Sequence, residues 1–104
     1  YCLTAHGAAV RQLSGDPKLG EMLVMNWPVA PLDARQTAML GFAEKMTVAS
    51  AAIVEADRDT LRGVGFSEAD IWDIAATASF YNMTNRMASA VDMRPNDEYH
   101  RQAR

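Results

Sequence analysis

The segment from Ile71 to Val91 constrains the fold of this chain more than any other. Its residues are apolar or small almost all the way round a helix, and no alternation of apolar and polar positions indicates a strand. A helix without a polar face is normally buried between neighbouring helices or at a subunit contact. Its alanine and serine positions let other helices approach closely. The segment therefore predicts a long helix that packs against other helices, within the chain or across an interface.

Shorter helical segments precede it. Residues 1–14 carry an apolar face at helical spacing, with Arg11 on the opposite, polar face. Asp16 is expected to cap a short helix, and Asp33 to cap the next one. Residues 47–51 are expected to form a loop or a frayed helix end.

The second half of the chain contains a weaker helix followed by the long one. The weaker helix covers residues 54–62 and ends at a stretch in which Gly65 suits a left-handed position. Ser67 is expected to cap the long helix, with Asp70 as its capping-box partner. Since no segment has a strand pattern, the fold class is predicted to be all-α, with about five helices.

The size of the chain limits its core. At 104 residues and 11.4 kDa it is one domain or part of one, and such a body buries only about 60 to 70% of its unfolded surface. Its first residue is Tyr rather than Met, which suggests an upstream segment. Residues 1–92 are therefore expected to be the C-terminal part of a helical domain, and residues 93–104 a polar tail.

Charge and cysteine content exclude several classes of function. The net charge of −3 and the acidic start of the long helix, at Glu68 and Asp70, argue against binding to nucleic acid. One cysteine cannot form an internal disulfide. No signal peptide and no apolar run of membrane-spanning length is recognisable. A cytoplasmic protein without a membrane partner is therefore expected.

The residues with most chemical potential are Cys2 and His6. Four residues apart on a helix, they are turned by about 40° from each other and share one face. The first turn of a helix favours an anion, and a neighbouring imidazolium favours thiolate. Such activation gives only about a threefold net gain in rate, because a less basic thiolate is a weaker nucleophile. Proton delivery by His6 to the leaving oxygen of a peroxide would contribute more, about a hundredfold.

Less specific interpretations of these residues remain open. A lone cysteine is often a small core residue, and the spacing of Cys2 and His6 arises easily by chance. A zinc site is weaker still, because the other histidine, His100, lies in the tail and tetrahedral sites need three or four protein ligands. No metal or other cofactor is expected.

The sequence as a whole resembles the carboxymuconolactone decarboxylase superfamily and, within it, the alkylhydroperoxidase D (AhpD)-like, peroxidase-related branch. Three segments in the family's order carry the resemblance and together span about two thirds of the chain. They are YCLTAHGAAVRQLSGDP, PLDARQTAMLGFAEKMT and EADRDTLRGVGFSEADIWDIAATASFYNMTNRMASAV.

The resemblance implies an all-helical domain that forms a homo-oligomer and uses a CxxC motif followed by a histidine. Cys2 matches the second cysteine, which attacks the peroxide, and His6 matches the histidine. The first, resolving cysteine would lie two positions before Tyr1, and the family's glutamate would also lie upstream. Tyr1 stands where well-studied members have histidine, and it is a weak candidate for lining the substrate pocket.

Three functions follow as hypotheses. The first is a thiol-dependent peroxidase that reduces a hydroperoxide at Cys2 and His6 and is recycled by an unidentified thiol reductant. The second is a decarboxylase-like enzyme that acts on a small lactone with His6 as acid or base. The third is a non-enzymatic helical module for oligomerisation.

Several other side chains are open to structural interpretations. The polar residues of the long helix are expected to tie helix ends or subunits together, or else to line a pocket; they are Asn82, Asn85 and Arg86. Trp27 and Trp72 are expected to be core or interface anchors. The methionines are expected to fill the core.

Overall fold

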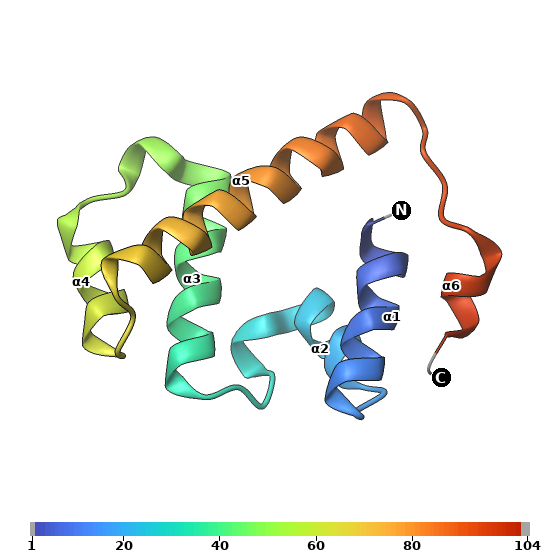
Figure 1. Cartoon of the computed structure of the whole chain (residues 1–104), viewed down its shortest axis with the longest axis horizontal. Helices are drawn as coiled ribbons and strands as arrows, with labels where there is room; N and C mark the ends of the chain where they lie inside the picture. The colour runs from blue at the N-terminus through green and yellow to red at the C-terminus, as the bar shows by residue number, and fades with distance from the viewer. Residues whose placement is uncertain (1, 103–104) are drawn as a thin grey trace. The chain divides into compact units, whose positions relative to one another are not determined.

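A computed structural model describes residues 2–102, and every described element is helical. Figure 1 shows the order of the elements along the chain. They are α1 (Cys2–Ser14), α2 (Leu19–Asn26), the 3₁₀ helix η1 (Trp27–Val29), α3 (Ala34–Ala49), the 3₁₀ helix η2 (Ser50–Ala52), α4 (Glu55–Gly63), α5 (Glu68–Ala90) and α6 (Asp97–Arg101). The all-α class is confirmed. The described residues contain one more α-helix than expected, because α6 forms within the segment predicted to be a polar tail.

Two of the expected helix starts are confirmed in atomic detail. Asp33 accepts from the backbone N–H of Gln36 at 2.8 Å, and Gln36 accepts in return from the backbone N–H of Asp33 at 3.1 Å. Ser67 and Asp70 form the same reciprocal pair at 3.1 and 2.8 Å. Each pair satisfies backbone N–H groups that have no partner within the helix. Asp33 and Ser67 therefore fix where α3 and α5 begin.

The expectation that Asp16 caps a helix is wrong. Its carboxylate accepts from the backbone N–H of Lys18 at 2.9 Å within a turn, and α2 begins only at Leu19. The short side chain bonds to the backbone two residues on, which is the alternative to helix capping that aspartate commonly adopts.

The expectation of a loop or frayed end at residues 47–51 is wrong. α3 continues to Ala49, and η2 follows directly. The Thr47 hydroxyl donates to the backbone carbonyl of Ala43 at 2.7 Å, and the side-chain amide of Asn82 donates to that hydroxyl at 3.1 Å. Asn82 therefore ties α5 to the last turns of α3, a contact between distant segments that local sequence signals do not contain.

The chain divides into two compact units, and α5 begins in one and ends in the other. The central unit comprises residues 32–83. Its core consists of Phe42 from α3, Leu61 from α4 and Ile71 from α5, with flanking apolar residues packed against them. Leu61 is fully buried. Each of the three helices thus supplies one buried side chain to a small core.

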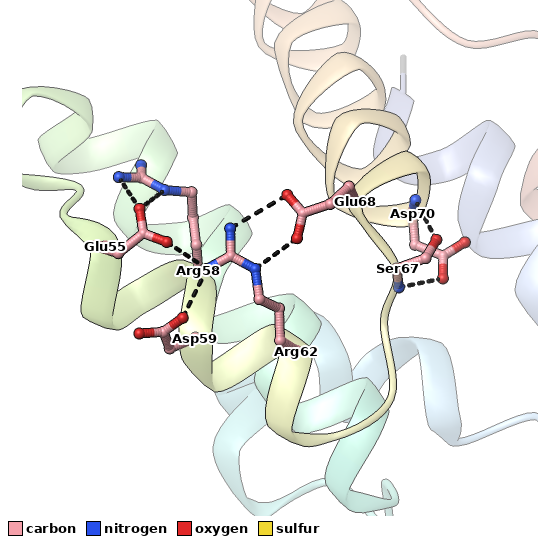
Figure 2. A network of polar contacts seen from close by, with 7 residues as sticks. All are labelled: Glu55, Arg58, Asp59, Arg62, Ser67, Glu68 and Asp70. Carbon is pink, nitrogen blue, oxygen red and sulfur yellow. Dashed lines mark hydrogen bonds and ion pairs between the residues drawn. The ribbon is translucent and has the colours of Figure 1, made fainter.

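Arg62 organises the polar side of the α4–α5 connection, as Figure 2 shows. Its guanidinium donates to the carboxylates of Glu55, Asp59 and Glu68, with the Asp59 and Glu68 contacts at 2.6 and 2.5 Å. Arg58 makes a further ion pair with Glu55 at 2.9 Å. Gly65 has a φ of 96° at the end of α4, which confirms the left-handed position expected there. The network joins the start of α4 to the start of α5.

Most of the apolar residues of α5 are exposed in the single chain, although the sequence predicts that they are packed. Within this helix only Ile71 is buried. Trp72 is 76% exposed, and Phe80, Met83 and Met87 are each more than half exposed. The core interpretation of Trp72 is therefore wrong, as is that of these methionines, whereas a role at an interface stays a prediction.

The terminal unit comprises residues 2–31 and 84–102 of the described chain. Figure 1 shows α1 (dark blue) with α2 on one side and α6 (red) on the other, and α1 contacts both helices. Ala8 on α1 is fully buried, and Arg11 is 8% exposed. The helical spacing predicts Arg11 on the polar outer face, which is wrong, because α6 covers that side of α1.

Candidate functional site

The first two turns of α1 bring Cys2 and His6 together. The Cys2 Sγ atom lies 3.2 Å from His6 Nδ1. Because both residues lie on one regular helix, the spacing of four residues places the imidazole directly over the thiol. The structure therefore brings together the two residues that the sequence predicts to carry the chemistry.

The contact allows two arrangements of one proton. A neutral thiol donates its proton to Nδ1, whereas a protonated Nδ1 donates to a thiolate. His6 Nδ1 also lies 3.1 Å from the backbone carbonyl oxygen of Cys2. A carbonyl oxygen can only accept a hydrogen bond, so this contact forms when Nδ1 carries the proton. The geometry thus permits proton exchange between the sulfur and the imidazole without movement of the helix.

The two side chains differ in their access to solvent. Cys2 is half-buried, and His6 is exposed. The imidazole can therefore exchange protons with bulk water, while the sulfur is partly shielded by the protein. Tyr1, the weak candidate for lining the substrate pocket, lies outside the described residues.

A cavity opens beside the same helix, within the terminal unit. Its volume is about 270 Å³, and its walls come from α1, α2 and α6. Leu3, Thr4, Gly7 and Arg11 form the α1 wall, and Tyr99 and His100 form part of the opposite side. Arg11, Tyr99 and His100 are not predictable as cavity residues from the sequence, because only the packing of α6 against α1 brings them together.

Of the remaining polar candidates, Asn82 has a structural contact, and the roles of Asn85 and Arg86 stay predictions. Asn82 is engaged with Thr47, and Asn85 and Arg86 are exposed on α5. Between residues 2 and 102, no group of three or more His, Cys, Asp or Glu side chains is arranged to hold a metal ion. None of the helices in this range is both long enough and apolar enough to cross a bilayer.

Comparison with solved structures gives two close matches. One is a peroxidase-related protein from Silicibacter sp. TM1040, with 71% sequence identity and a TM-score of 0.98. The other is a peroxidase-related protein from Ralstonia eutropha JMP134, described as an alkylhydroperoxidase AhpD core, with 43% identity and a TM-score of 0.95. Each match covers the whole of this chain.

The matches are longer than this chain, which spans 55% of the length of each. No model of a known protein family and no curated protein matches the sequence. The two solved structures confirm the resemblance drawn from the sequence motifs, since they agree with the chain over its full length in both sequence and fold.

Proposed function

Because the chain belongs to the AhpD-like, peroxidase-related family, we propose that it is a thiol-dependent peroxidase that reduces hydroperoxides. Cys2 is the nucleophile and His6 is the residue that transfers the proton. The observation that carries this proposal is the 3.2 Å contact between Cys2 Sγ and His6 Nδ1. It supplies a nucleophile with a proton donor one helical turn away.

The reaction begins with attack by the Cys2 thiolate on the terminal oxygen of a hydroperoxide. A sulfur–oxygen bond forms and the oxygen–oxygen bond breaks, so the sulfur loses two electrons and becomes a sulfenic acid. The leaving alkoxide takes a proton from His6 and departs as an alcohol. Delivery of this proton is the step in which His6 contributes most, by about a hundredfold or more.

Recycling requires a second thiol. The sulfenic acid condenses with a reductant thiol to give a mixed disulfide and water, and a further thiol releases Cys2. Cys2 is the single cysteine of these 104 residues, and the family resemblance implies a resolving cysteine two positions before Tyr1. We propose that a thiol reductant returns Cys2 to the thiol, and in a test on these 104 residues alone an added dithiol supplies the second thiol.

Steady-state kinetics with cumene hydroperoxide and dithiothreitol test the assignment of the two residues. Cys2→Ser should reduce peroxide consumption to the uncatalysed rate, because a hydroxyl cannot replace the thiolate. His6→Gln should lower kcat/KM by about a hundredfold, since the proton donor is lost. Leu13→Gln, at an 88% exposed position on the same helix, is the matched control and should leave the rate unchanged.

The same experiment separates the proposed peroxidase from the other candidate functions. Unchanged peroxide consumption in Cys2→Ser would overturn the proposal. An activity on small lactones that survives complete alkylation of the thiol would support a decarboxylase-like enzyme in its place. A thiol that reacts with hydroperoxide no faster than free cysteine would leave the decarboxylase-like enzyme and the non-enzymatic module, which the lactone assay separates.

We further propose that the protein works as a homo-oligomer in the cytoplasm. Exposed large apolar side chains on α5, with Trp72 at 76% exposure, support self-association because such residues are costly to leave in water. A reducing compartment supports the location, since it supplies thiols and keeps a lone cysteine reduced.

A further inference from the structure

Arg11 is a buried cation whose bonding capacity is only partly used. It is 8% exposed. Its Nε donates to the backbone carbonyl of Gln102 at 3.2 Å, and its Nη2 donates to the carbonyls of Tyr99 and Gln102 at 3.3 and 3.0 Å. A guanidinium carries five N–H donors, so these bonds occupy three of them. The two N–H groups of Nη1 have no acceptor among the described residues.

Arg11 makes no ion pair with the residues that the structure describes. The ion pairs found between residues 2 and 102 do not include it, and its partners are neutral carbonyls at the end of α6. Burial of a cation without an anion is unfavourable. Since no buried side-chain nitrogen among the described residues lacks a hydrogen-bond partner, Nη1 is open to solvent on its free side, where an anion can reach it.

The free side of the guanidinium borders the cavity in the terminal unit. A Cβ atom built on Gly7 would lie 3.7 Å from Arg11 Nη1, and both residues line the cavity. Gly20 on α2 also lines the cavity, and a Cβ built there would lie 3.8 Å from the Gly7 carbonyl oxygen. Of the two glycines, Gly7 is the one next to Nη1.

The other walls are mainly apolar and include Leu3, Val24 and Met25. We propose that this cavity binds a small monocarboxylate, whose carboxylate accepts hydrogen bonds from Arg11 Nη1 and whose apolar body lies along these three side chains. The proposal concerns a binding site distinct from the Cys2–His6 pair, and it does not rest on the proposed peroxidase activity.

One lining residue limits the charge of the ligand. Glu21 is exposed and also lines the cavity. Its carboxylate repels anions, and the repulsion grows with the charge of the ligand. A singly charged carboxylate is therefore favoured over a phosphate, which carries up to two negative charges at neutral pH.

Binding of octanoate, with octan-1-ol as the neutral control, tests the proposal by ¹H–¹⁵N NMR titration of the purified chain. Octanoate should bind saturably and shift the Gly7 and Gly20 amide signals, and octan-1-ol should bind at least tenfold more weakly. Glu21→Gln should tighten octanoate binding, because it removes a repulsive charge. Inorganic phosphate should bind more weakly than octanoate.

Gly7→Ala is the variant that blocks the site without removing Arg11. Its methyl group would stand in van der Waals contact with Nη1, and alanine is a better helix former than glycine by about 1 kcal/mol, so the fold is kept. It should weaken octanoate binding at least tenfold. Gly63→Ala is the matched control, because a Cβ there meets no atom within 4 Å. Equal affinity for octanoate and octan-1-ol, no saturable binding, or unchanged binding in Gly7→Ala would overturn the proposal.

Discussion

Asp92 adopts a left-handed backbone conformation, with a φ of 53°, directly after the end of α5. The Met93 N–H bonds to the Ala88 carbonyl at 2.9 Å and the Asp92 N–H to the Ser89 carbonyl at 3.5 Å. This is a Schellman motif, in which the left-handed residue is usually glycine. An aspartate there carries a steric cost and places a negative charge at the negative end of the helix dipole.

Asp92→Gly should therefore stabilise the protein by about 1 kcal/mol. The ion pair that the substitution removes, with Arg94, is 82% exposed on both sides and contributes little. Thermal denaturation followed by circular dichroism measures the effect, with Arg94→Ala as the control for loss of the pair. A lower melting temperature for Asp92→Gly than for the parent chain would contradict this account.

Single residues also show what a sequence can and cannot predict. The pairing of Cys2 with His6 is predictable, because it depends only on the helical spacing of four residues. The burial of Arg11 is not, because it depends on α6, which lies about ninety residues further along the chain. A charged residue on an amphipathic helix is ordinarily assigned to the solvent face, and no local signal shows that carbonyl groups from a distant helix cover it.

Among the elements, ion pairs of Arg62 connect α4 to the start of α5, and these ion pairs should weaken in acid. The Arg62 guanidinium lowers the pKa of Glu68 below its ordinary value of 4.5, and together with Arg58 it lowers that of Glu55. The Lys45 ammonium lowers the pKa of Asp57 below its ordinary 3.8. Because these pKa values are lower in the folded state than in the unfolded state, the stabilisation is fully present above about pH 4.5 and is lost as the pH falls through the folded-state values.

Arg62→Ala should destabilise the protein at pH 7 and have a much smaller effect at pH 3. The reason is that Arg62 lowers the pKa values of Glu55 and Glu68 in the folded state, so their ion pairs with Arg62 are present at neutral pH and are lost as the pH falls through those values. Chemical denaturation at the two pH values measures the difference. Arg94→Ala, which removes one fully exposed pair, should show little effect at either pH. An Arg62→Ala effect of equal size at pH 3 and pH 7 would mean that the side chain stabilises through packing instead of charge.

The long helix α5 shows a second limit of prediction from sequence. Its start at Ser67 and Asp70 was predictable, since a capping box is a local signal. Its apolar positions predict packing, but within the described residues only Ile71 of this helix is buried, so a packing partner for the rest stays a prediction. In the single chain Trp72 and Phe80 are exposed, so the sequence pattern predicts a contact that one chain does not make.

At the scale of the whole molecule, the exposed apolar residues of α5 predict a stable oligomer. Light scattering coupled to size-exclusion chromatography should give a mass that is a multiple of 11.4 kDa. Trp72→Glu should shift the population towards the monomer, because a charge would have to be buried at the interface. Leu13→Glu, at an 88% exposed position of α1, is the control. A parent chain that stays monomeric at micromolar concentration would contradict the prediction.

The central proposal is that Cys2 is a peroxidatic thiol that has no second cysteine within these 104 residues to resolve it. The most direct test is the stoichiometry of cumene hydroperoxide consumption by the 104-residue chain in the absence of any added thiol. We predict rapid consumption of about one equivalent per chain, formation of a sulfenic acid at Cys2, and renewed turnover when dithiothreitol is added. Repeated turnover without added thiol, or consumption no faster than that by free cysteine, would contradict the account.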